Sequence, residues 1–385
     1  MPPPSTASTP SMPPLMSPLA LVGRTDSPTI SSCTQSKSTK STLGTPLSES
    51  QRGIAVAAYQ QMDNSKKWRL ASGRYVEDVM HNVLLTQPYE HPCQYCVLDV
   101  DDANWIDIFT LEERNEIRQL TPAIEYPPMP ADMINFIINI PDTKDLATIY
   151  NHLEKTPLDF NTQKHLLWLK HTFQNAIDLI DQKYLPITNQ QEEDIYTLVW
   201  KFIGDAFTTN GSNLTAKQQQ LSSVFKAANN KKRKIAMNEP IERQKYALIP
   251  DMTIYHGSQA YAVLEAAKTQ DDTKQLVETY KKCPELMVDI FNQVLQTHPT
   301  EQRNIKIYGC VLSKVTCCSL MLSNPFGYVK LVSHGKQLMH AEIQDAFKLD
   351  MAALLEHIWG FKLAIEAVVD AMTQSKYNNS PFKQK

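Results

Sequence analysis

The feature that most constrains the fold is a change in the spacing of apolar residues part-way along the chain. Up to about residue 207, apolar residues recur every three or four positions, as at Leu166, Leu169 and Phe173, which predicts helices with one buried face. After residue 245, short apolar runs alternate with turns and with two long helical stretches. The resulting order of hairpin, helix, three strands and helix predicts an α/β (α+β) fold, in which helices flank a mixed β-sheet.

The same patterns predict the individual elements and their grouping into regions. The expected helices cover residues 72–86, 109–120, 143–154, 161–183, 190–207, 272–297 and 344–372, and the expected strands cover 93–100, 246–255, 261–266, 305–312, 314–322 and 327–333. The first 50 residues are rich in Pro, Ser and Thr and lack apolar periodicity, which is typical of a disordered tail. We predict a disordered tail (1–50), a mainly helical region (51–207), a polar basic linker (208–240), an α/β core (241–373) and a flexible C-terminus (374–385).

Composition indicates the cellular setting. The 385-residue chain has a net charge of -3, and none of its apolar runs approaches the roughly 20 residues of a membrane helix, so we expect no membrane segment. The N-terminus lacks the basic start and unbroken apolar core of a secretory signal. Seven scattered cysteines suit reduced thiols better than a disulfide framework. We therefore expect an intracellular protein.

A basic run lies within the predicted linker and consists of Lys231, Lys232, Arg233 and Lys234. Such a run favours nuclear localisation through an import receptor, or contact with nucleic-acid phosphates. A solvated loop of the same composition is the alternative, and the slightly acidic chain argues against a broad nucleic-acid surface.

The stretch KYALIPDMTIYHGSQAYAVLEAAKTQ, residues 245–270, holds the candidate chemistry. Pro250 cannot donate a ladder hydrogen bond, so Asp251 is expected near a strand end, and Glu265 leaves an apolar run at another strand end. Two carboxylates on adjacent strand ends suit a hard cation such as Mg²⁺, and Lys268 can stabilise charge on a phosphate. The alternative is a structural one, in which Glu265 and Lys268 are ordinary solvated charges around a hairpin.

These residues resemble the motif of the PD-(D/E)XK nuclease superfamily. The resemblance implies a restriction-endonuclease-like αβββαβ core with a helical insertion. It implies that Asp251 and Glu265 hold Mg²⁺, that Lys268 assists phosphodiester cleavage, and that Glu77 on an upstream helix is a possible fourth member of the site. The substrate implied is nucleic acid.

A second resemblance covers about residues 65 to 372. Short motifs in this chain are similar to those of a group of fungal proteins with no defined activity: Val76-Glu77-Asp78-Val79, Glu90-His91-Pro92, Glu265-Ala266-Ala267-Lys268 and Tyr308-Gly309. In the nuclease motif one residue separates the acid from the lysine, whereas two alanines do so here. Lys268 would then face away from Glu265 unless the strand bulges or ends. A catalytically inactive scaffold or interaction module on the same fold is therefore the alternative function.

Cysteine motifs offer further candidates. His91, Cys93 and Cys96 have a spacing that suits zinc, but buried free thiols are favoured because no second ligand pair completes the set. Cys317 and Cys318 alternate faces of a predicted strand, so they cannot both line one site, and core packing explains at least one of them.

Nucleotide-binding, hydrolase and zincin motifs are absent from the sequence, so we expect no organic cofactor.

Overall fold

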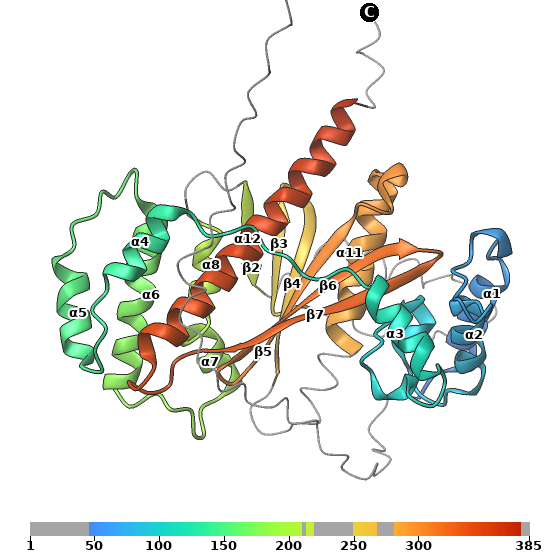
Figure 1. The fold of residues 1–385 in the computed structure, drawn as a ribbon, viewed down its shortest axis with the longest axis horizontal. Coiled ribbons are helices and arrows are strands. Elements are labelled where there is room, and N and C mark those ends of the chain that lie inside the picture. The colour runs from blue at the N-terminus through green and yellow to red at the C-terminus, as the bar shows by residue number, and fades with distance from the viewer. Residues whose placement is uncertain (1–45, 210–212, 219–248, 268–280, 379–385) are drawn as a thin grey trace, which may run out of the picture. The chain divides into compact units, whose positions relative to one another are not determined.

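The centre of the molecule is a seven-stranded mixed β-sheet in the order β1-β7-β6-β5-β4-β3-β2 (Figure 1). The structure is a computed structural model that describes residues 46–209, 213–218, 249–267 and 281–378. Its strands are β1 (Val97–Leu98), β2 (Leu214–Gln218), β3 (Met252–His256), β4 (Gln259–Ala267), β5 (Lys306–Ser313), β6 (Thr316–Phe326) and β7 (Val329–Met339). The predicted mixed sheet with flanking helices is confirmed.

Neighbouring strands are parallel at two places in the sheet and antiparallel at the others. β2, β3 and β4 are antiparallel neighbours, and so are β5, β6 and β7. β4 and β5 are parallel, and α11 (Cys283–Thr297) lies between them in the chain. β1 is parallel to β7 and lies at the opposite edge of the sheet from β2. Gly257, at φ +58°, lies in the tight turn between β3 and β4, where a residue without Cβ avoids strain.

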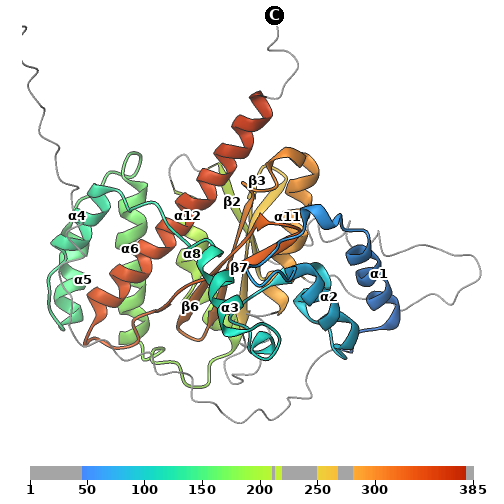
Figure 2. The same ribbon diagram turned by 45° about the vertical axis from the view of Figure 1, so that its right-hand side comes forward.

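Two long helices cover opposite faces of the sheet. A Cβ on Gly309 of β5 would meet side chains of α11, whereas the neighbouring Tyr308 packs against Phe361 of α12 (Phe347–Asn378). Because successive strand residues point to opposite faces, α11 and α12 lie on different sides of the sheet. Figure 2 shows α12 crossing in front of the strands.

Most predicted helices are present, with shifted ends. The described helices are α1 (Glu49–Gln60), α2 (Val76–Thr86), α3 (Leu111–Leu120), α4 (Ala131–Asn139), α5 (Leu146–Lys155), α6 (Lys164–Asp181), α7 (Glu192–Leu198), α8 (Lys201–Ala206), α11 and α12, with short 3₁₀ turns η2 (Asn64–Lys66), η3 (Pro92–Tyr95), η4 (Ala103–Trp105) and η6 (Pro299–Glu301). The predicted Thr110 cap of α3 is confirmed, since Thr110 and Glu113 form a reciprocal capping box. α2 begins after Tyr75, three residues beyond the predicted Ser72 cap.

Three local predictions differ from the structure. Residues 93–100 were expected to form a strand, but they form η3 and the two-residue β1, because Cys96 adopts a left-handed conformation (φ 56°) that ends the turn. α4 lies in a stretch for which no helix was predicted, and Pro130 precedes its first turn, where a missing N–H costs nothing. The predicted linker 208–240 contains β2, which extends the sheet at β3.

Apolar side chains of the sheet pack into two separate clusters. The larger one fills the space between the sheet and α4–α8, α11 and α12, and the smaller one lies among α1, α2, α3 and the β1–β7 edge. Neighbouring residues of β7 enter different clusters: Leu331 packs in the smaller and Val332 in the larger. All described residues belong to one compact unit beginning at Pro46. Among these residues, no helix combines the length and apolarity required to cross a bilayer.

Candidate active site

Asp251 lies directly before β3 and beside the end of β4. Its Oδ2 accepts a hydrogen bond of 2.7 Å from the backbone N–H of Ala266, the residue after Glu265. Pro250 stands outside the ladder, which begins at Met252. The structure thus brings Asp251 close to Glu265, at the same end of two antiparallel strands.

Glu265 is a fully buried carboxylate that is paired with a lysine of the next helix. Its exposed fraction is 0%, and its Oε2 forms an ion pair with Nζ of Lys282, whose side chain is 24% exposed. Glu265 pairs in the ladder with Val311, two residues beyond Gly309, so its side chain lies on the α11 face. Lys282 precedes α11 and supplies the cation that a buried carboxylate requires, because an unpaired charge loses much of its hydration energy.

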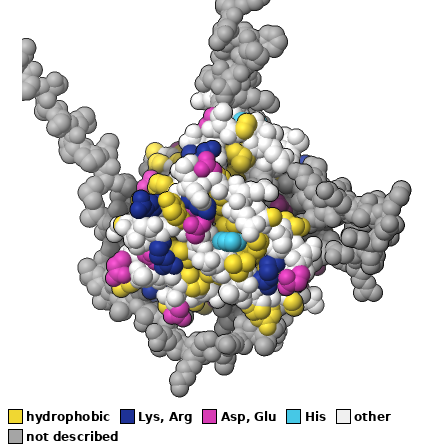
Figure 3. Space-filling model, turned by 90° about the vertical axis from the view of Figure 1, so that its right-hand side faces the viewer, with side chains coloured by type: hydrophobic (Ala, Val, Ile, Leu, Met, Phe, Trp, Pro, Cys, Tyr) yellow, Lys and Arg dark blue, Asp and Glu magenta, His cyan; other side chains and the backbone are white. Residues whose placement is uncertain are grey.

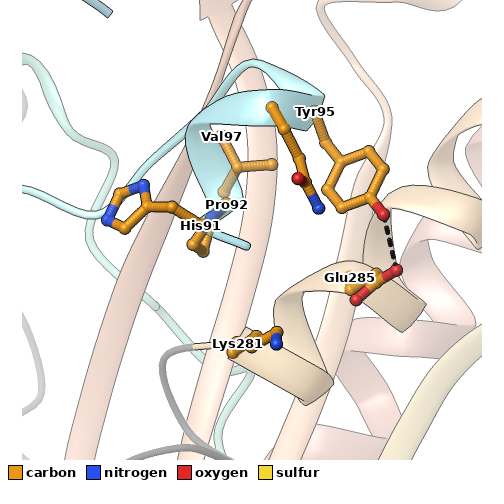
Figure 4. A pocket seen from close by; sticks show the side chains of 7 residues that line it. His91, Pro92, Tyr95, Val97, Lys281 and Glu285 are labelled. Atoms are coloured by element: carbon orange, nitrogen blue, oxygen red, sulfur yellow. Dashed lines mark hydrogen bonds between the residues drawn. The ribbon is translucent and has the colours of Figure 1, made fainter. Parts of the chain in front are cut away.

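Contacts between η3 and α11 hold Lys282 in this position. The Tyr95 hydroxyl donates a hydrogen bond of 2.7 Å to Oε1 of Glu285 (Figure 4). Nζ of Lys281 lies 3.0 Å from Oε2 of Glu90, and Lys281 also lines the small hollow between η3 and α11 that Figure 4 shows. Burial, and then the charge of Glu285, raises the pKa of the Tyr95 hydroxyl, which therefore remains a donor. Because Lys281 and Glu285 flank Lys282, these contacts fix the first turn of α11.

Tyr196 on α7 brings a hydroxyl to the same end of the sheet. Burial is the largest cause that raises the pKa of this hydroxyl, and the charge of Asp251 comes next, with a smaller effect of Glu265. The hydroxyl oxygen is buried, and it has no hydrogen-bond partner among the described residues. A neutral hydroxyl beside two carboxylates can donate to a water molecule or to a phosphate oxygen.

Glu77 lies apart from this group and stabilises the fold. Its two carboxylate oxygens accept hydrogen bonds from the backbone N–H groups of Trp68 (2.9 Å) and Tyr328 (2.8 Å). Tyr328 is in the turn between β6 and β7, and two strands separate β7 from β4. Burial raises the pKa of Glu77 although the hydrogen bonds oppose that effect. The structure therefore does not bring Glu77 to Asp251 and Glu265.

The remaining predicted site residues lie outside the described part of the chain. They are Lys268, the lysine of the sequence motif, and the import candidates Lys231, Lys232, Arg233 and Lys234. Lys282, in contrast, was not predicted as a site residue. The sequence does contain a sign of its role. A lysine at the start of a helix is repelled by the positive end of the helix dipole, so its presence there indicates an acidic partner nearby.

The predicted zinc candidates belong to the smaller apolar cluster. Cys93 and Cys96 are buried and form no disulfide, and burial raises the pKa of Cys93 to about 12 and that of Cys96 to about 11. Nδ1 of His91 accepts a hydrogen bond from the backbone N–H of Cys93, and its Nε2 lies 3.1 Å from Asp102. Both nitrogens of this histidine are thus engaged within the protein.

The donor set at the end of β3 and β4 suits a hard cation better than zinc. Asp251 and Glu265 offer carboxylate oxygens, which Mg²⁺ prefers. Among the described residues, no group of three or more His, Cys, Asp or Glu side chains is arranged to hold a metal ion. A cation here would therefore be held by two carboxylates, with water or substrate oxygens completing its shell.

No protein-family model, curated protein or solved structure matches this chain.

Proposed function

We propose that this protein is a PD-(D/E)XK-like nuclease that hydrolyses phosphodiester bonds of nucleic acid with Mg²⁺. The observation that carries the proposal is the meeting of Asp251, Glu265 and Lys282 at adjoining strand ends. Asp251 and Glu265 would hold the cation, which would supply Lewis-acid stabilisation of phosphate charge. Lys282 would take the part that the sequence motif gives to Lys268, since its Nζ already contacts Glu265.

The order of elements supports the proposal. Among the helices and strands that the structure describes, α8, β2, β3, β4, α11 and β5 come in the order αβββαβ along the chain, and the four strands lie side by side in that order. The acidic residues stand at the start of the second of these strands and near the end of the third. This is the layout that the sequence resemblance implies, with the intervening lysine supplied by the helix.

The surface on the side of α1, α2 and α3 argues against nucleic-acid binding there. Figure 3 shows lysine and arginine side chains interspersed with aspartate and glutamate on that face. Phosphate binding requires an excess of positive charge. Nucleic acid is therefore expected to approach at the Asp251–Glu265 end of the sheet.

Cleavage of linear and circular DNA and of RNA, with Mg²⁺ or Mn²⁺, tests the proposal. We expect Asp251→Ala to abolish cleavage and Lys282→Met to lower kcat by about 100-fold or more, the usual cost of losing one charge-stabilising group. Asp107→Ala, which removes an exposed carboxylate elsewhere, is the matched control and should cleave like the original protein. Metal-dependent cleavage that persists in Asp251→Ala, or a chain that cuts none of these substrates, would refute the proposal.

A catalytically inactive interaction module on the same fold is the second candidate. The observation that favours it is the complete burial of Glu265 against Lys282, which satisfies the carboxylate without a metal. Calorimetric titration with Mn²⁺ separates the two functions. The nuclease binds Mn²⁺ and loses this binding in Asp251→Ala, whereas the inactive module gives no heat from either protein.

We also propose that the basic run 231–234 directs the protein to the nucleus through an import receptor. Its support is the sequence pattern of four consecutive cations. Replacing Lys231, Lys232, Arg233 and Lys234 by alanine in a fluorescently tagged protein should move the signal from the nucleus to the cytoplasm. An unchanged distribution would contradict it.

A further inference from the structure

Two cysteine thiols meet on the face of the sheet that α12 covers. The sulfurs of Cys310 on β5 and Cys317 on β6 lie 3.2 Å apart. Cys310 shares its face with Tyr308, two residues before it, which packs against α12. The exposed fractions of the two cysteines are 2% and 0%, and both belong to the larger apolar cluster. In this reduced form, one thiol donates a weak hydrogen bond to the sulfur of the other.

The register of the β5–β6 hairpin fixes this contact. Ser313 pairs with Thr316 across a turn of two residues. The same ladder places Leu312 opposite Cys317, and Cys310 lies two residues before Leu312, so both cysteine side chains point to one face. Because strands twist with a fixed hand, one diagonal of an antiparallel ladder is closer than the other. The contact between the two sulfurs shows that they occupy the close diagonal.

The adjacent Cys318 does not share this contact. It pairs with Val311, which also pairs with Glu265, so the Cys318 side chain lies on the α11 face of the sheet. β6 thus presents two consecutive cysteines to opposite faces. The fold places one of these thiols beside Cys310 and the other on the far side of the sheet.

Proximity is what this pair offers to an oxidant. The hydrogen bond with Cys317, and then burial, raises the pKa of the Cys310 thiol, which therefore stays protonated at neutral pH. A protonated thiol is a poor nucleophile, so the first oxidation is slow. Once one sulfur is oxidised, the second needs to move only about 1 Å to reach the disulfide bond length of about 2.05 Å.

We propose that Cys310 and Cys317 form a dithiol site that a hydroperoxide oxidises to a disulfide across the β5–β6 hairpin. A small hydroperoxide suits a site in the core, because hydrogen peroxide is little larger than a water molecule and strand fluctuations that admit water also admit it. Low-molecular-weight disulfides are far bulkier. The proposal does not depend on the nuclease function.

The reaction takes two steps. In the first, one thiol attacks a peroxide oxygen, the O–O bond breaks, and the products are a sulfenic acid and one water molecule, which carries the thiol proton. In the second, the other thiol attacks the sulfenic sulfur, the S–S bond forms as the S–O bond breaks, and a second water leaves with the remaining proton. The two thiols lose two electrons in total, which the peroxide gains.

Peptide mapping after peroxide treatment tests the proposal. Trypsin cleaves after Lys314, so Cys310 leaves in one peptide, and Cys317 and Cys318 leave together in the next. The folded full-length chain is treated with hydrogen peroxide, free thiols are blocked with iodoacetamide, and the non-reduced digest is analysed by mass spectrometry. We expect the two peptides to be joined, with fragmentation assigning the bond to Cys317 at least about tenfold more often than to Cys318. Dithiothreitol should separate them again.

Unfolding and substitution supply the controls. In the urea-unfolded chain, the loops from Cys310 to Cys317 and to Cys318 differ by one residue and close at nearly the same entropic cost, so we expect about equal amounts of the two bonds. Cys318→Ala, on the opposite face, is the matched control and should leave the joined peptides unchanged. Cys317→Ala should remove them.

Three results would overturn the proposal. One is the absence of joined peptides after peroxide treatment of the folded protein, and another is a bond to Cys318 that is as frequent as the bond to Cys317. Both are read from the original protein, so they hold even where a variant does not fold. The third is joined peptides that persist in Cys317→Ala when circular dichroism shows that this variant is folded.

Discussion

At the scale of single residues, the pair formed by Glu265 and Lys282 is the centre of the candidate active site. The Glu265 carboxylate is fully buried, whereas the Lys282 ammonium reaches solvent. The carboxylate therefore needs its partner for charge compensation more than the ammonium does. Removing the lysine leaves a buried negative charge, whereas removing the carboxylate leaves a cation that water can hydrate. Lys282 thus stabilises the fold even before any metal or substrate is considered.

A double-mutant cycle measures this pair. We expect Lys282→Met to lower the free energy of unfolding by about 2–4 kcal/mol and Glu265→Gln to lower it by less, with a coupling energy of about 1–3 kcal/mol. Urea denaturation of the two single variants and the double variant gives these values. Additive effects of the two changes would show that the side chains do not interact in solution.

At the scale of secondary-structure elements, close contact between α11 and β5 positions Lys282 over the sheet. A Cβ on Gly309 would lie 2.7 Å from Sδ of Met287 and 2.8 Å from Sγ of Cys283, both on α11. Glycine therefore permits the helix to approach the strand closely. The distance between these two elements decides whether Lys282 reaches Glu265.

Substituting this glycine tests the close approach. We expect Gly309→Ala to destabilise the protein by about 1–3 kcal/mol because the added methyl group overpacks the contact. Gly53→Ala on α1, where nothing lies within 4 Å of the added Cβ, is the control and should stabilise by roughly 0.5–1 kcal/mol. Equal urea midpoints for Gly309→Ala and the original protein would contradict the packing that the structure shows.

At the scale of the molecule, the β1–β7 edge joins the smaller apolar cluster to the rest of the sheet. Asp99 and His334 lie 235 residues apart in sequence, and their contact links the strand from the N-terminal region to the C-terminal strands. The pKa of His334 in the folded protein, about 10, lies above its usual value of 6.5. Its contribution to stability is therefore complete below pH 6.5 and is lost as the pH rises through 10.

Stability as a function of pH measures this link. We expect the original protein to lose on the order of 2 kcal/mol more than His334→Gln between pH 6.5 and pH 10, because only the original protein releases this proton. Urea denaturation of both proteins across this range gives the difference. Parallel curves for the two proteins would show that His334 titrates normally.

The sequence by itself determined the local structure and part of the site. Apolar periodicity sets the helices and strands, because one buried face requires a repeat of 3.6 or 2 residues. That periodicity predicted the mixed sheet with flanking helices. The hairpin around Gly257 is a local turn, so the sequence also predicted that Asp251 and Glu265 lie on neighbouring strand ends.

Only the tertiary structure decided which distant residues meet. The Glu77 carboxylate accepts a hydrogen bond from the backbone N–H of Tyr328, 251 residues away. Glu77 therefore stabilises the fold and does not lie beside Asp251. Lys282 meets Glu265 because η3 and Gly309 fix the start of α11 against the sheet. Asp99 and His334 come together because β1 adds to the edge of β7. Such contacts depend on strand order and helix docking, which no local repeat in the chain encodes.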